Sequence, residues 1–145
     1  MNLDALYQEI ILDHYKSPHG QGLQPDFTGE AFHVNTSCGD EVTVRVMVAD
    51  GTIKEMTHDG VGCSISRASA SVLHDLTDKQ ESNKFYELLD EFVELMHSQG
   101  KTEPNEDVLG DAAAFAGVSK YPARVKCALL PWMAMKDAME GNTDE

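Results

Sequence analysis

Three cysteines and one aspartate are the residues of this sequence best suited to chemistry. The cysteines are Cys38, Cys63 and Cys127, and Asp40 follows the first of them in the run SCGD. We expect each cysteine at a junction: a turn between strands, the passage from a strand to a helix, and the first turns of the last helix. Such junctions can converge on one side of a compact domain. Three thiolates and a carboxylate suit a four-coordinate Zn²⁺ site, and thiolates also bind iron–sulfur clusters.

The spacing of the cysteines leaves other uses of a thiol open. They are 25 and 64 positions apart, and the sequence has no CxxC pair of the zinc-ribbon or thioredoxin type. Buried small hydrophobes and a free reactive thiol are therefore alternatives to a metal or a cluster. Gly39, Gly60 and Gly62 give the backbone room around two of the cysteines, which fits ordinary turns equally well. An odd cysteine count without a signal peptide argues against disulfides and predicts a cytoplasmic protein.

Positive charge gathers around the third cysteine although the chain is acidic. The net charge of −14 argues against a nucleic-acid binder, and no apolar run is long enough to cross a membrane. Residues 120–136 nevertheless contain four basic side chains and no acid: Lys120, Arg124, Lys126 and Lys136. Arg124 and Lys126 flank Cys127, so they can offset the charge of a thiolate site or keep a thiolate ionised. The alternative is a solvated helix face.

The hydrophobic pattern predicts the elements that position these residues. Helices are predicted over residues 3–17, from about 64 to 76, over 82–98 and over 121–139, with short helical turns between 106 and 118. Strands are predicted over residues 30–35, 41–50 and 52–59, with a hairpin at Asp50-Gly51. Strands followed by helices, rather than alternation, predict an α+β fold. It has a three-stranded antiparallel sheet with helices on one face, and the N-terminal helix comes first.

Three smaller expectations concern the helices. Ser64 or Ser66 is expected to cap the helix that follows Cys63. Pro131 is expected to kink the last helix or to shift its hydrogen bonds. His14 falls on the apolar face of the first helix, and we expect a packed, hydrogen-bonded core residue rather than a metal ligand.

Four stretches of the sequence resemble the U-type iron–sulfur assembly proteins SufU and IscU. They are YQEIILDHYKSPHGQG, NTSCGDEV, DGVGCSISRASAS and GVSKYPARVKCALLPW, which reach from residue 7 to residue 132. The sequence looks closest to SufU, because the IscU branch has a histidine where this chain has Lys126. Residues 77–111, called the acidic segment below, hold ten acids against three lysines and include a longer connection typical of SufU. The resemblance thus implies a single domain over residues 1–145 with an acidic helical insertion.

The resemblance also implies a function. The fold would be of the SufE/NifU-like kind, with a zinc site made by Cys38, Asp40, Cys63 and Cys127. The partner would be a SufS-type cysteine desulfurase, a pyridoxal-phosphate enzyme that makes persulfide from cysteine. Cys38 would accept the sulfur and pass it to a SufB-containing scaffold, with Arg124 supporting the thiolate or zinc site. This favours an enzyme, a zinc-dependent sulfurtransferase.

The sulfur acceptor would have to leave the metal, because a metal-bound thiolate is occupied. We expect Cys38 to move, since a turn releases a ligand more easily than a helix does. Two alternatives remain open at this stage. One is a scaffold that binds a transient [2Fe–2S] cluster on the same ligands, and the other is a zinc-stabilised interaction domain without sulfur transfer.

Overall fold

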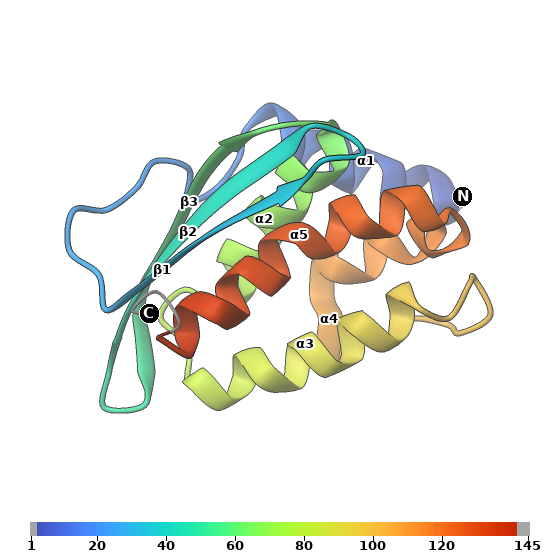
Figure 1. Ribbon diagram of the computed structural model, residues 1–145. Helices are drawn as coiled ribbons and strands as arrows, with labels where there is room; N and C mark the ends of the chain where they lie inside the picture. The colour runs from blue at the N-terminus through green and yellow to red at the C-terminus, as the bar shows by residue number, and fades with distance from the viewer. Residues whose placement is uncertain (1–2, 142–145) are drawn as a thin grey trace.

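A three-stranded sheet and a set of helices on one of its faces make up the protein. The computed structural model describes residues 3–141. In chain order the elements are α1 (Leu3–Lys16), β1 (Gly29–Asn35), β2 (Asp40–Ala49), β3 (Thr52–Val61), α2 (Ser64–Thr77), α3 (Ser82–Met96), α4 (Glu106–Leu109), the 3₁₀ helix η1 (Gly110–Lys120) and α5 (Pro122–Met139). The sheet is antiparallel in the order β1–β2–β3, and the helices cover one side of it (Figure 1). The predicted α+β fold with the N-terminal helix first is confirmed.

Strict alternation along β2 separates the two faces of the sheet. Val42, Val44 and Val46 are buried, whereas the residues between them are exposed or half-buried. Because successive side chains of a strand point to opposite faces, these valines form one apolar strip. Helix α5 packs against β1 and β2, and α2 packs against β3. Asp50 and Gly51 adopt φ angles of 55° and 74°, which confirms the predicted two-residue hairpin.

Small side chains on α2 allow its neighbours to approach closely. Ala68, Ser69, Ala70 and Ser71 are all buried where α2 meets α1 and α5. Ser69 joins two of these helices directly, because its hydroxyl donates to the carbonyl of Ala128 at 2.6 Å. The same hydroxyl oxygen accepts a hydrogen bond from the indole N–H of Trp132 at 3.0 Å. These bonds fix α5 against the helix that begins at the second cysteine.

The start of α2 differs from the prediction. Its N-cap residue is Cys63, which makes no side-chain capping bond, and neither Ser64 nor Ser66 holds that position. Ser66 lies inside the first turn, where its hydroxyl donates to the carbonyl of Cys63 at 3.1 Å. The side chain that accepts the backbone N–H of Cys63 comes from a different strand and belongs to the site described below.

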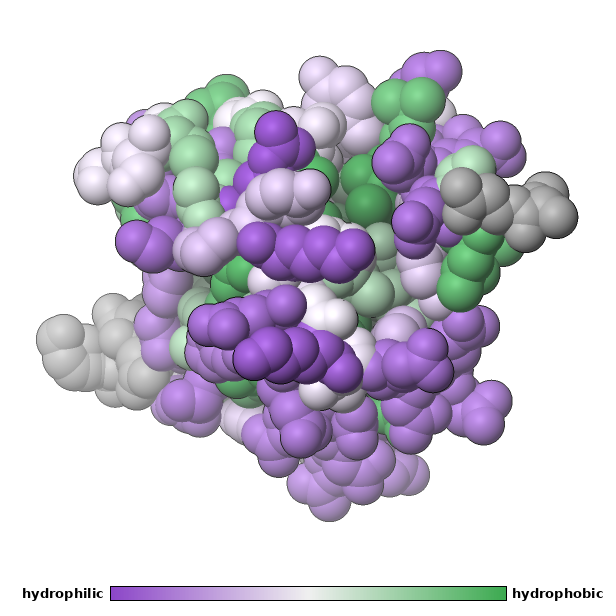
Figure 2. Space-filling view, turned by 90° about the vertical axis from the view of Figure 1, so that its right-hand side faces the viewer, coloured by the Kyte–Doolittle hydropathy of each residue, from purple (hydrophilic) through white to green (hydrophobic). Residues whose placement is uncertain are grey.

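The acidic segment contributes one wall of the core through α3. The ring of Phe92 stacks on Trp132 of α5, with centroids 4.2 Å apart and planes 11° apart. Phe115 of η1 packs edge-on against the ring of Phe92, with the ring centroids 5.9 Å apart. The opposite side of α3 carries exposed acids such as Glu87 and Asp90. In Figure 2, the lower part of the face shown is mostly hydrophilic.

Pro131 lies inside a helix that continues past it. Helix α5 runs from Pro122 to Met139, so the proline does not end it. Because proline has no N–H, the carbonyl four residues earlier, that of Cys127, lacks its helical donor. The predicted shift in hydrogen bonding therefore falls on the residue that carries the third thiol. Among the residues from 3 to 141, no helix is long and apolar enough to cross a membrane.

Candidate metal centre

The four predicted metal ligands gather at one end of the sheet. Cys38 lies in the turn between β1 and β2, Cys63 between β3 and α2, and Cys127 in the second turn of α5. The Sγ atoms of Cys38 and Cys127 are 3.5 Å apart, and Sγ of Cys63 is 3.7 Å from Oδ2 of Asp40. One ligand atom from each of Cys38, Asp40 and Cys127 lies within 4.8 Å of the other two. The expectation that three junctions converge is met.

The turn that carries Cys38 is closed by the residue that ends β1. The carbonyl of Asn35 accepts the N–H groups of Cys38 at 3.3 Å and Gly39 at 2.9 Å, and its side-chain oxygen accepts the N–H of Ser37 at 3.2 Å. Gly39 has a φ of 73°, which favours glycine. Cys38 itself is exposed. The first thiol therefore sits on a tight turn at the surface.

Asp40 is a buried carboxylate that packs closely against Gly62. Its side chain is fully buried, and Oδ1 accepts the N–H of Cys63 at 2.8 Å. That N–H belongs to the N-cap residue of α2, where the helix dipole favours negative charge. A Cβ atom at Gly62 would overlap this carboxylate, so the space it fills exists only because residue 62 is glycine. Gly62 thus makes room for the predicted oxygen ligand.

Cys127 is the buried member of the set. It is only 2% exposed, and burial is the main cause that raises the pKa of its thiol. The side-chain amide of Asn35 donates toward its sulfur at 3.7 Å. Three thiols and one buried carboxylate supply the sulfur and oxygen ligands that zinc accepts in four-coordinate sites. The residues present therefore fit a bound zinc ion.

Arg124 lies near this group without contacting the thiols. Its side chain is exposed and lines a cavity of about 470 Å³ that also includes Tyr7, Ser64 and Tyr121. Within residues 3–141, no hydrogen bond or ion pair joins Arg124 or Lys126 to a cysteine. Ser64, which also lines this cavity, directly follows the predicted ligand Cys63 in the sequence, and Arg124 precedes Cys127 by three positions on α5. Its support of the thiolate or zinc site stays a prediction.

The sequence does not reveal the part played by Asn35. This residue is buried at the end of β1, where it shapes the Cys38 turn with one side-chain atom and faces the Cys127 sulfur with another. An asparagine three positions before a cysteine is ordinary turn chemistry. Only the position of α5 over β1 brings it to the third thiol.

Comparison with known proteins agrees with this geometry. The family of NifU-like N-terminal domains matches residues 6–128. The zinc-dependent sulfurtransferase SufU of Bacillus subtilis (strain 168) is 36% identical over 135 residues, which cover 93% of this chain and 90% of that protein. The iron–sulfur cluster assembly scaffold protein IscU of Streptococcus pyogenes serotype M1 is 36% identical over 138 residues, which cover 95% and 85%.

Solved structures share the fold over almost the whole chain. FiSufU from Fervidobacterium islandicum AW-1 matches with a TM-score of 0.80 and 31% identity, over 95% of this chain and 99% of that one. A NifU-like N-terminal protein from Brucella abortus matches with a TM-score of 0.86 at 22% identity, over 96% and 95%, and shows the fold alone. By sequence and by fold, this chain belongs to the U-type iron–sulfur cluster assembly family, the family of NifU-like N-terminal domains.

Proposed function

We propose that this protein is a zinc-dependent sulfur-transfer protein of iron–sulfur cluster assembly. It accepts persulfide sulfur from a SufS-type cysteine desulfurase on Cys38 and passes it to a SufB-containing scaffold. The observation that carries the proposal is the difference in exposure among the three thiols: Cys38 is exposed, Cys63 half-buried and Cys127 buried. Only an exposed thiol can meet a persulfide held by another protein. The similarity to a relative named as a zinc-dependent sulfurtransferase supports this activity.

The zinc ion would be held by Cys38, Asp40, Cys63 and Cys127. Bound zinc would favour the thiolate form of its sulfur ligands, because a coordinating thiol is deprotonated. The chain itself supplies the positioning. The N–H of Cys63 orients the Asp40 carboxylate, and the amide of Asn35 faces the Cys127 sulfur. The turn closed by Asn35 leaves Cys38 as the most exposed of the three cysteines.

The transfer needs no oxidant beyond the persulfide. Once Cys38 has left the set of metal ligands, its thiolate attacks the outer sulfur of the cysteine persulfide on the desulfurase. The sulfur–sulfur bond of that persulfide breaks, a new one forms on Cys38, and the desulfurase cysteine leaves as a thiolate. The sulfur then moves to the scaffold by the same exchange, with Cys38 as the leaving thiolate. Gly39 allows this turn a backbone conformation that other residues adopt at a cost.

A cluster scaffold is the second candidate, because the same donors bind iron and a scaffold protein IscU is equally similar in identity. Anaerobic incubation with iron, sulfide and a desulfurase separates the two functions. Sulfur transfer predicts that the protein keeps its zinc and stays colourless. A stable coloured cluster on the cysteines would favour the scaffold instead.

The direct test of sulfur transfer is mass spectrometry after incubation with the desulfurase and cysteine. We expect a mass increase of one sulfur atom, located on the peptide that contains Cys38 and absent from Cys38→Ala. Ser37→Ala is the matched control, because it changes the same exposed turn and leaves all thiols in place. If Cys38→Ala stimulates the desulfurase as well as the unmodified protein does, sulfur transfer through Cys38 is wrong. The chain then acts as a zinc-stabilised interaction domain.

A further inference from the structure

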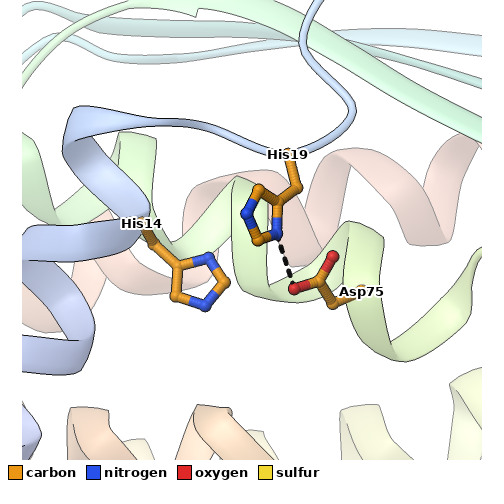
Figure 3. A group of neighbouring side chains, drawn as sticks. All are labelled: His14, His19 and Asp75. Atoms are coloured by element: carbon orange, nitrogen blue, oxygen red, sulfur yellow. Dashed lines mark hydrogen bonds and ion pairs between the residues drawn. The ribbon is translucent and has the colours of Figure 1, made fainter.

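A second group of metal-binding side chains lies away from the cysteines. His14 comes from the last turn of α1, His19 from the loop that follows it, and Asp75 from the last turn of α2 (Figure 3). One ligand atom from each of the three lies within 4.8 Å of the other two. The imidazole rings of His14 and His19 have their centroids 4.9 Å apart. Two imidazoles and a carboxylate thus lie together where the end of α1 and the loop after it meet α2.

This group is separate from the candidate metal centre. Cys63 precedes α2 and Asp75 lies near its end, twelve positions later in the sequence. A helix rises 1.5 Å per residue, so the two positions are about 18 Å apart along the axis. No side chain belongs to both groups. A metal ion bound by His14, His19 and Asp75 would therefore be independent of sulfur transfer at Cys38.

The backbone of His19 is fixed although its ring is exposed. Its N–H donates to the hydroxyl of Ser71 at 2.8 Å, and its carbonyl accepts a hydrogen bond from Nε2 of His58 at 2.7 Å. Ser71 and His58 are both fully buried. The next residue, Gly20, packs so closely on His74 that a Cβ atom there would overlap that ring. The loop therefore presents the imidazole of His19 from a defined position.

His14 has a hydrogen-bond partner for each of its ring nitrogens. Nδ1 lies 2.7 Å from the Ser71 hydroxyl, and Nε2 lies 3.1 Å from the Asp111 carboxylate. If either nitrogen binds a metal, the N–H on the other still has an acceptor. A metal-bound histidine usually donates its second N–H in this way, which orients the ring. The buried, hydrogen-bonded state expected for His14 is confirmed, and a metal bound at one of its nitrogens would replace the partner on that side.

We propose that His14, His19 and Asp75 form a second metal site, which binds a divalent transition-metal ion of borderline character such as Zn²⁺ or Fe²⁺. Nδ1 of His19 and Oδ2 of Asp75 are already 2.7 Å apart. They need only small movements to share an ion at about 2.0–2.2 Å from each ligand. The side chains of His19 and Asp75 are 49% and 41% exposed, so water can enter and complete the coordination.

Such an ion would connect three parts of the chain. It would tie the end of α1 and the loop after it to the end of α2, across a contact that already has two hydrogen bonds of Ser71 and the bond between His19 and Asp75. A ligand that binds only the folded state raises the free energy of unfolding. The site therefore predicts a gain in thermal stability from a second equivalent of metal, separate from any effect on activity.

Isothermal titration calorimetry tests the site with Zn²⁺ itself. The starting protein carries one zinc per chain, measured by metal analysis, so that the thiolate centre is filled. We expect a second binding event with a stoichiometry of one and a rise in melting temperature. His19→Ala and Asp75→Asn should each weaken this event about tenfold or more, as loss of a group that binds or orients a metal does. Both residues are exposed, so neither substitution removes core packing.

Matched controls are available on α3 and at its end. Asp90→Asn and His97→Ala remove the same side-chain types from exposed positions outside the group and should leave the second event unchanged. Paramagnetic Ni²⁺ added to the zinc-loaded protein should broaden NMR signals of residues 14, 19 and 75, and not those of residues 38, 63 and 127. The proposal is wrong if no second event occurs, if the controls weaken it equally, or if the broadening lies elsewhere.

Discussion

Gly62 passes so close to the buried carboxylate of Asp40 that a side chain at position 62 would overlap the carboxylate oxygen. The two residues are on neighbouring strand ends, and the φ of Gly62, 147°, is itself one that glycine tolerates best. The carboxylate predicted as the oxygen ligand of the candidate metal centre can therefore occupy its position only because residue 62 has no side chain. Adding one methyl group at position 62 tests whether Asp40 needs this space.

Gly62→Ala should lower zinc affinity and stability together. The methyl group must displace Asp40, and the backbone conformation adds about 1–3 kcal/mol of strain. Competition with a zinc chelator and chemical unfolding measure the two effects. Gly39→Ala is the matched control, because Gly39 also has a positive φ, 73°, but has no atom within 4 Å of a new Cβ. Equal loss of zinc affinity in both variants would show that overlap with Asp40 is unimportant.

Phe92→Ala should remove a large part of the folding free energy. The ring is fully buried and stacks on Trp132, and such truncations cost about 3–5 kcal/mol. Chemical denaturation measures the loss. Phe32→Ala deletes the same ring from a position that is 57% exposed, and it should cost much less. Similar losses in the two variants would mean that α3 is not part of the core in solution.

His58 makes stability depend on pH. Burial lowers its pKa to about 4, from about 6.5 in an unfolded chain. Between these values the unfolded chain binds a proton that the folded protein does not. The free energy of unfolding therefore falls as the pH drops from 6.5 toward 4, by on the order of 3 kcal/mol in total. The contribution is fully present above pH 6.5.

Unfolding curves at several pH values, with zinc content held equal, isolate this effect. His58→Gln keeps a donor for the His19 carbonyl and cannot titrate, so its stability should fall less on acidification. Parallel loss of stability in the two proteins would contradict the role given to His58.

Arg124→Ala should weaken the response of the desulfurase and leave zinc in place. The side chain is exposed at the cavity beside Ser64 and has no bond to the cysteines, so the ligands keep their positions. Loss of a charge at a contact surface slows association. We expect several-fold less stimulation in the desulfurase assay, with unchanged zinc by metal analysis. Lys54→Ala removes an exposed positive charge from β3 near the Asp50-Gly51 hairpin, at the end of that strand away from Cys63, and should have no effect.

Local patterns were sufficient to predict most of the fold. Alternating valines give β2, Asp50-Gly51 gives the hairpin, and the apolar stripe of α3 gives its buried face, because each depends on near neighbours in the chain. The start of α2 was predicted wrongly for the same reason. Serines are common helix caps, but the group that accepts the N–H of Cys63 is Asp40, from another strand. Sequence spacing cannot show that partner.

The candidate site was predictable to the extent that its residues mark junctions. The cysteines and Asp40 stand where elements begin or end, so their convergence follows from a compact fold. The pair of His14 and His19 shows the limit. Their rings meet because Ser71 and His58, on α2 and β3, hold the loop in place. Five positions of sequence between two histidines do not indicate such a contact.

The stacking of Phe92 on Trp132 has a consequence for how this chain can change over generations. The inner side of α3 packs against the ring of Trp132 on α5, whereas its outer side faces water and bears exposed acids. Substitutions on the outer side are open to selection for new surface properties at little structural cost. Loss of the whole helix would have a larger structural cost. A relative without α3 would need another apolar side chain to bury Trp132.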